Sequence, residues 1–566
     1  MADLAASSAP LIRPRVSRDD WVMRLGIVGL VILLMVFVAL PLWALLSKSF
    51  EDANGNFVGL ANYIRYFSTP ALFASIENSF LVAILSTVIV LPLAFVYAYA
   101  LTRARLPFKP VFQAAALVPI LAPSLLPAIS LIYLFGNQGI FKGLLFGGSI
   151  YGAGGIVAAQ VFYCFPHVLM ILVTALAMSD GRLYEAAQAL GASRWRIFWT
   201  VTLPGARYGV ISAAFVAFTL VITDFGIAKV IGGRFNVLAT DVYKQVVGQQ
   251  NFQMGAVVGL VLLAPAVLAF LVDAAVQRKQ VALLSARAVP YDPKPRTGRD
   301  LPLLIYCAVV AAIVVGILGM AVWASFVKRW PYNLSLTFAN YDFDEFDPAG
   351  WDPVWTSLKM AAAAAAIGAV LIFVGAWLLE KSRGFHFTRG VARFLATLPL
   401  AVPGLVLGLG YIFFFIERGN PLHFLYATLA ILVVNTVAHF YTVAHVTAVT
   451  ALKQLDAEFE SVSASLKVPL TTTLVRVTAP ICLPAILDIF VYLFANAMTT
   501  VSAVIFLYGP DTKLAAVAVI NMDEAGMTAA AAAMATIIVL VSLAIRLLHL
   551  VIERTLLARL QRWRRR

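Results

Sequence analysis

The side chains that could ligate a metal or attack a substrate are few and widely separated in this chain. Six histidines and three cysteines occur among 566 residues. His439 and His445 lie six positions apart and therefore do not share one face of a helix. Cys164, Cys307 and Cys482 fall inside apolar stretches without metal-ligand spacing, which indicates packing. We expect neither a catalytic centre nor a metal site.

Sequence signatures of enzymatic catalysis are also absent. The chain contains no phosphate-binding G-x-x-x-x-G-K-[ST] loop, no H-E-x-x-H pair and no nucleophile elbow. We therefore expect that the chain is not an enzyme and that it binds no cofactor of its own.

The polar loop that begins at Asp180 has the pattern of a short surface helix. Aspartate is a common N-terminal cap, and Leu183, Ala187 and Leu190 recur at helical spacing. Gly191 then supplies a left-handed stop. The pattern predicts an amphipathic helix that suits either the membrane surface or a partner protein.

A second short helix is predicted to follow in the same loop. It extends from Ser193 to about Thr202. Pro204 then stands where a helix tolerates proline, in the first turn of the next long helix. The loop therefore presents one apolar face together with the carboxylate of Glu185.

The composition places this loop in a membrane protein. Hydrophobic residues make up 61% of the chain and charged residues 12%, with a mean hydropathy of +0.90, which excludes a soluble globular domain. Apolar runs long enough to cross a bilayer recur throughout. We predict an all-α polytopic membrane protein with about twelve spans. They are 24–46, 75–101, 111–135, 153–177, 206–231, 254–276, 302–326, 355–379, 393–416, 424–448, 481–507 and 527–551.

The chain repeats itself after about 276 residues. The segments Thr174–Asp180 (TALAMSD) and Thr450–Asp456 (TALKQLD) correspond, and further matching positions keep the same order. Those positions are Pro204 with Pro480, Pro119 and Pro123 with Pro399 and Pro403, and residues 61–63 with 339–341. Two homologous halves of six spans each would enter the membrane in the same orientation, as parallel repeats.

Charge and composition suggest how the chain is divided. We expect a cytoplasmic N-terminal segment (1–22), a first repeat (23–276), a cytoplasmic linker (277–300), a second repeat (301–552) and a basic cytoplasmic tail (553–566). The net charge of +14 gathers on loops of one side, which places both termini in the cytoplasm. The partner of this charge is then the lipid bilayer and not nucleic acid.

Part of the first polar loop resembles a known family motif. Glu185-Ala186-Ala187, Gly191, Val201 and Leu203-Pro204 stand at the spacing of the EAA motif of ABC-importer permeases, with Val201 in place of isoleucine. The resemblance covers nearly the whole chain because the second half repeats the arrangement. It implies the type I ABC importer fold.

The resemblance also implies partners. In such permeases the motif loop is a coupling helix that docks on a cytoplasmic ABC ATPase, so two copies of that subunit are expected to bind ATP and Mg. A periplasmic substrate-binding protein is expected to deliver the solute. The implied location is the bacterial inner membrane.

The equivalent loop of the second half, residues 456–480, departs from the motif. Phe459, Ser463 and Leu466 keep the helix face, and Pro480 matches the motif proline. By resemblance, Phe459, Leu466 and Pro480 belong to a second coupling loop.

Three positions of this second loop carry a residue type that differs from the family motif or from its spacing. Ser461 stands at the position of the motif glutamate, and Glu460 precedes it by one residue. Both are assigned to the second coupling loop. Lys467 replaces the motif glycine and would resist a left-handed stop, so Pro469 is expected to end the helix.

Polar residues inside apolar spans mark candidate positions of a solute pathway. Asp224 follows the first motif loop, whereas Thr499 and Thr500 follow the second. Asp224 aligns with Thr500 on the 276-residue offset. We expect all three to face the translocation path; the alternative role is an interhelical hydrogen bond.

The solute is suggested only by resemblance. The stretch from Phe459 to Asp488 is most similar to 2-aminoethylphosphonate permeases, with ferric-iron permeases next. Thiamine, polyamine and sulfate importers remain alternatives. A different class, an ion-coupled secondary transporter, would also have twelve spans in two halves.

Overall fold

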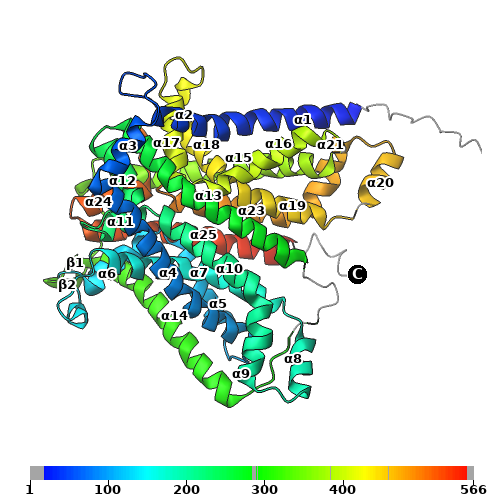
Figure 1. The fold of residues 1–566 in the computed structure, drawn as a ribbon, viewed down its shortest axis with the longest axis horizontal. Coiled ribbons are helices and arrows are strands. Elements are labelled where there is room, and N and C mark those ends of the chain that lie inside the picture. Colours follow the sequence, from blue (N-terminus) through cyan, green and yellow to red (C-terminus); the bar gives the residue numbers. More distant parts are fainter. Residues whose placement is uncertain (1–17, 283–288, 290, 383, 457, 558–566) are drawn as a thin grey trace, which may run out of the picture.

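The protein is a predominantly helical bundle in the computed structural model (Figure 1). The structure describes residues 18–282, 289, 291–382, 384–456 and 458–557. Within this part the only sheet is a hairpin of β1 (Val327–Arg329) and β2 (Asn333–Leu336), with Val327 opposite Leu336. The predicted all-α class is confirmed. Much of the predicted N-terminal segment, linker and basic tail lies outside the described residues.

Within the described residues, up to twelve helical segments are long and apolar enough to span a membrane, eight of them unbroken helix runs and four of them bent pairs. The unbroken runs are α1–η1–α2 (Arg18–Leu34, Met35–Ala39, Leu40–Ser49), α4 (Pro70–Arg103), α7 (Ala153–Ala177), α9–η4–α10 (Arg194–Ile197, Phe198–Thr202, Leu203–Thr223), α13 (Phe252–Ala282), α14 (Thr297–Phe326), α15 (Asp352–Lys381) and α25 (Thr528–Ile552).

The bent pairs complete the set. They are α5–η2 with α6 (Lys109–Leu117, Val118–Leu121, Leu125–Phe135; 103°), α16–η8 with α17 (His386–Thr397, Leu398–Ala401, Gly404–Phe415; 115°), α18 with α19 (Leu429–His439, Tyr441–Lys453; 56°) and α21–η10–α22 with α23 (Leu470–Thr473, Leu474–Thr478, Ala479–Ile481, Leu483–Thr499; 74°). Shorter helices are α3 (Ala61–Ser68), α8 (Gly181–Ala189), α11 (Gly226–Ile231), α12 (Leu238–Tyr243), α20 (Glu458–Ser465) and α24 (Ala515–Glu524).

The third span of each half breaks where an extended residue precedes a proline. Ala122 (φ −99°, ψ 144°) precedes Pro123, and Val402 (φ −102°, ψ 118°) precedes Pro403. Proline disfavours helical backbone at the residue before it, so the helix stops there. These runs, predicted as continuous spans, are therefore sharp bends at equivalent points of the two repeats.

Two other predicted spans have different limits. The run predicted over 206–231 begins earlier, at Arg194, and ends at Thr223, and the run predicted over 481–507 ends at Thr499. Apolar composition continues past these ends because the segments that follow, α11 in the first repeat and a turn in the second, are largely buried. The apolar pattern alone therefore overestimates their length.

The first span of each half packs against the other half. The helices α1 and α2 pack on α15, α16 and α17, whereas α14 packs on α4, α5 and α6. The Tyr411 hydroxyl donates to the carbonyl of Phe37 at 2.6 Å, and the Tyr306 hydroxyl donates to the carbonyl of Leu93 at 2.7 Å. Because the first span of each half packs on the other half, the two repeats form one bundle.

The two ends of the bundle carry different elements. Figure 1 shows α8 and α20 at one end, which we call the α8/α20 end, and β1, β2, α11, α12 and α24 at the other, the hairpin end. At the hairpin end, Ser79 accepts from the backbone N–H of Leu238 and Ser357 accepts from that of Ala515, both at 2.8 Å. These equivalent caps repeat after about 277 residues, as the sequence predicts.

Candidate functional site

The first polar loop folds as predicted at its start and end. The side chain of Asp180 accepts from the N–H of Arg182 at 3.0 Å and caps α8. Hydrogen bonds from the Arg182 side chain and then its backbone lower the pKa of Asp180 to about 2. Gly191 ends the helix with φ +70°. The predicted cap and left-handed stop are confirmed.

The predicted apolar face of α8 points away from the bundle. Leu183 is 57% exposed and Leu190 87% exposed. Tyr184 instead faces the body and is buried: its hydroxyl accepts from Nε of Arg103 at 3.2 Å and donates to Thr202 Oγ1 at 3.1 Å. The helix is therefore attached to the bundle through Tyr184 and offers Leu183 and Leu190 outward.

The remaining motif residues lie on either side of this contact. Glu185 and Ala186 are exposed on α8. The predicted second helix is present and continues through η4 into α10, and Pro204 stands in the first turn of α10, as predicted. The π-helical turn η4 directly precedes Leu203 and Pro204 and accommodates the missing N–H of proline. The turn η10 stands in the same way before Pro480.

The second loop presents a similar helix, α20. Phe459 is 41% exposed and Leu466 is 70% exposed, whereas Ser463 is buried and hydrogen-bonds Thr473. The predicted face is therefore divided: its large apolar members point outward and its serine points inward. Phe459, Val462 and Leu466 line a groove of about 510 Å³ with residues of α21 and η10.

Glu460 does not take the place of the motif glutamate. Its carboxylate forms an ion pair with Lys381 at the end of α15. Glu460 therefore stands where Tyr184 stands in the first repeat, and Ser461, exposed, stands where Glu185 stands.

The predicted end of α20 is wrong. Lys467 adopts the left-handed conformation, with φ +54°, and Pro469 begins the next helix as the cap of α21. The N–H of Val468 donates to the carbonyl of Ser463 at 3.0 Å, as Ala192 donates to Ala187 in the first loop. This 6→1 hydrogen bond requires a left-handed residue, and it outweighs the cost of a lysine there.

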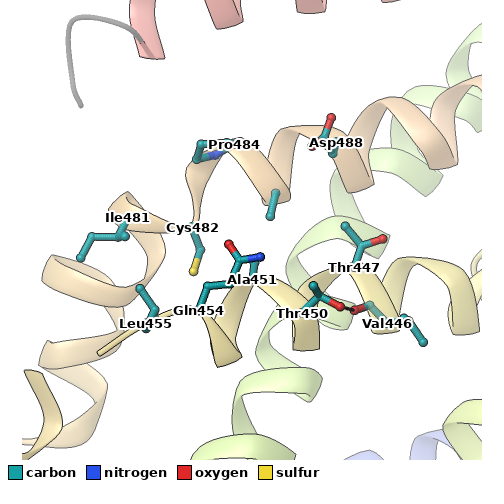
Figure 2. A pocket seen from close by; sticks show the side chains of 11 residues that line it. Val446, Thr447, Thr450, Ala451, Gln454, Leu455, Ile481, Cys482, Pro484 and Asp488 are labelled. Atoms are coloured by element: carbon teal, nitrogen blue, oxygen red, sulfur yellow. Dashed lines mark hydrogen bonds between the residues drawn. The ribbon is translucent and has the colours of Figure 1, made fainter. Parts of the chain in front are cut away.

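A cavity of about 390 Å³ lies beside the second loop, between α19 and the bend of α22–α23 (Figure 2). Thr447, Thr450 and Asp488 contribute polar atoms to its wall, and His549 Nε2 lies 3.5 Å from the Asp488 carboxylate. The corresponding crossing of α7 and α10 is tight, since a Cβ on Gly209 would lie 2.2 Å from that of Ala175. The two repeats therefore differ in packing at the α8/α20 end.

The three predicted pathway residues end equivalent helices. Asp224 ends α10, and its Oδ2 accepts from Gln160 at 3.0 Å and from the N–H of Ile227 at 2.9 Å. Thr499 is the last residue of α23, and Thr500 follows it with backbone angles close to those of Asp224. Asp224 thus makes the interhelical hydrogen bond that was the alternative role, and it lines a small cavity with Gln160.

Two basic residues that hold the loop helices were not among the residues predicted for the site. Arg103 and Lys381 end the second span of each repeat, 278 residues apart, and contact Tyr184 and Glu460 respectively. The sequence signal that could have identified them is a basic residue at the end of the second span in both repeats.

A bundle of up to twelve spans in two repeats, with a matched surface helix in each repeat, defines a polytopic membrane permease. The profile of the family "Binding-protein-dependent transport system inner membrane component" matches residues 90–281 and 375–557. The chain belongs to this family, whose members are permease components of ABC importers.

Individual relatives extend over different parts of the chain. A ferric transport system permease of Actinobacillus pleuropneumoniae is 26% identical over 92% of this chain and 77% of its own length. A probable sulfate transport system permease of Chlorokybus atmophyticus is 27% identical over 41% of this chain and 81% of its own. A crystal structure of a bacterial alginate ABC transporter with an alginate-bound periplasmic protein matches 48% of this chain and 97% of its own, at 15% identity and a TM-score of 0.40.

Proposed function

We propose that α8 and α20 each dock on one copy of a cytoplasmic ABC ATPase that hydrolyses ATP with Mg, while a periplasmic binding protein delivers solute at the hairpin end. The observation that carries this proposal is the pair of helices α8 and α20 at one end of the bundle (Figure 1). Leu183 of α8 and Leu466 at the end of α20 are exposed. Exposed apolar side chains rimmed by polar ones are typical of protein interfaces.

The contacts beneath the helices supply a route for the motion. Displacement of α8 would pass through Tyr184 and Arg103 into α4, and displacement of α20 through Glu460 and Lys381 into α15. Both second spans then move with the ATPase subunits. This is alternating access driven from the α8/α20 end.

The orientation and domain limits belong to the same proposal. The α8/α20 end is cytoplasmic, with both chain termini on that side, because Lys and Arg gather on its loops. Residues 23–276 and 301–552 form the two repeats, joined by the cytoplasmic segment 277–300, and the membrane is the bacterial inner membrane.

The docking role is tested by co-purification. We expect that Leu183→Asp and Leu466→Asp each reduce the ATPase recovered with the permease, because a carboxylate would be buried without a partner. Leu183→Met keeps the apolar surface and serves as the control. An ion-coupled secondary transporter would purify without an ATPase, and its transport would collapse with the ion gradient alone.

The proposed pathway includes Asp224, Thr499 and Thr500. Their place at the ends of α10 and α23, where the helices turn, supports the proposal. Cysteines at these positions should react with aqueous thiol reagents in at least one nucleotide state. Protection in every state would remove them from the pathway.

The proposed solute is ferric iron, supported by the ferric transport relative that matches most of the chain. The resemblance of Phe459–Asp488 to 2-aminoethylphosphonate permeases keeps that phosphonate as the second candidate, although no relative reported above is a phosphonate permease. Uptake of both radiolabelled solutes in cells lacking this gene separates the candidates. Loss of phosphonate uptake alone would overturn the ferric assignment.

A further inference from the structure

We propose that Tyr291, in the segment that joins the two repeats, is a positioning residue for α8. The first docking helix is then held by the joining segment as well as by the bundle. This inference rests on the docking role proposed for α8.

The joining segment hydrogen-bonds the start of α8. The N–H of Gly181 donates to the carbonyl of Val289 at 2.8 Å, and the N–H of Val289 donates to Oδ1 of Asp180 at 3.4 Å. Gly181 is the first residue of α8, so the joining segment satisfies one of the N–H groups that a helix start leaves unpaired.

Tyr291 also contacts Tyr184 of α8, and both rings lie near the same cation, the guanidinium of Arg103. Its ring centroid lies 4.6 Å from that of Tyr184, and the Arg103 guanidinium lies 4.8 Å from the Tyr291 ring and 5.0 Å from the Tyr184 ring. Arg103 is only 3% exposed. The two rings contact each other, and the guanidinium lies beside both of them. A cation shielded from water is attracted to each of the two rings.

The joining segment is itself fixed at its far end. Nη2 of Arg299 donates to the carbonyl of Lys294 at 2.8 Å, and the N–H of Arg296 donates to Asp300 at 2.8 Å. These contacts fold residues 294–296 onto the start of α14, which packs on the first repeat. Movement of α8 is therefore resisted through Tyr291 and α14 as well as through Arg103 and α4.

The second repeat has a different arrangement. In the described residues α20 is held by the Lys381–Glu460 ion pair and the Ser463–Thr473 hydrogen bond. The N-terminal helix contacts the turn that follows α20, where the N–H of Leu470 donates to Asp19 at 3.1 Å. The two docking helices should therefore move with unequal ease.

The test uses the intact permease assembled with its ATPase subunits in lipid nanodiscs. We expect that Tyr291→Ala raises ATP hydrolysis in the absence of binding protein about five-fold, since a desolvated cation–π contact is lost. Tyr291→Phe keeps the ring and should behave as wild type. Asp292→Asn, at the exposed neighbouring position, is the control for disturbance of the segment.

A distance measurement separates positioning from a general loss of structure. Spin labels on Gln188→Cys in α8 and Lys109→Cys in α5 should give a broader distance distribution in Tyr291→Ala and an unchanged one in Tyr291→Phe. Wild-type distances and hydrolysis in Tyr291→Ala would overturn the inference. If Leu183→Asp retains the ATPase, the docking proposal fails instead, and the spin-label result still decides whether Tyr291 positions α8.

Discussion

Lys381 forms an ion pair with Glu460 at the point of the second repeat where Arg103 contacts Tyr184 in the first. The repeats have kept a basic residue at the end of the second span and changed its partner from an aromatic ring to a carboxylate. Although the second motif departs from the family pattern, α20 therefore keeps a contact with the end of the second span. Its glutamate serves the attachment of α20 to the bundle.

The ion pair gives a charge-reversal prediction. Lys381→Glu should loosen α20 and lower ATPase recovery, because two carboxylates then face each other, while Lys381→Glu with Glu460→Lys should restore it. The side chains are 12% and 31% exposed, so the pair is worth about 1 kcal/mol. Hydrogen exchange of residues 458–466 measures the loosening. A double variant no better than the single one would contradict the assignment.

The two helix stops give a matched pair of backbone predictions. Lys467→Gly should stabilise the second loop by about 1 kcal/mol, because glycine adopts a positive φ without strain. Gly191→Ala should destabilise the first loop by about the same amount. Hydrogen exchange of α8 and α20 is the measurement. Lys467→Ala, which removes the side chain and keeps the strain, separates the backbone effect from loss of charge.

The sequence predicted what periodicity and special residues encode. Asp180 and Gly191 mark the limits of α8 because capping and positive φ depend on residue type. The prediction for Lys467 was wrong because the hydrogen bonds at the end of a helix can hold a lysine at the positive φ that glycine usually adopts. Pro403 indicates that the helix is interrupted near Val402, but the 115° angle between its two parts depends on the neighbouring helices and cannot be read from the sequence.

Contacts between distant segments were beyond prediction. The pairing of Tyr291 with Tyr184 joins residues that no spacing rule relates. The packing of α14 on the first repeat likewise follows from shape complementarity between apolar helices, which the apolar pattern does not encode.

At the hairpin end an ion pair joins the two repeats. We expect this ion pair to hold the hairpin end of the bundle closed. Lys229 in α11 pairs with Glu524 in α24, and its Nζ lies 4.6 Å from the centroid of the Tyr243 ring. Tyr243 in turn stacks on Phe506 of the other repeat, with centroids 6.4 Å apart. We expect that Lys229→Ala weakens this closure and increases labelling of a cysteine at Thr500 from the hairpin side.

The control for that prediction is a cross-link. Cysteines replacing Lys229 and Glu524, joined by a bifunctional thiol reagent with a cleavable spacer, should block transport until the spacer is cleaved, because in the wild-type protein two long side chains bridge the gap between the helices. Full transport by the cross-linked protein would show that these helices do not separate during the cycle.

Asp523, beside this ion pair, predicts a pH dependence of stability. Burial, and then the charge of the neighbouring Glu524, raise the pKa of Asp523 from 3.8 to about 6. The folded protein therefore holds this proton more tightly than the unfolded chain. The contribution to stability is full below about pH 4, decreases as the pH rises toward 6 and is lost above that value.

Asp523→Asn removes the titration while keeping a side chain of the same shape. We expect the variant to be more stable than wild type at pH 7.5 and the difference between their unfolding temperatures to shrink as the pH falls from 7 to 4. Thermal unfolding in detergent across this range measures it, and Asp511→Asn, an exposed position at the same end, is the control for a general charge effect. Because other groups titrate equally in both proteins, a constant difference across the range would mean that Asp523 does not titrate there.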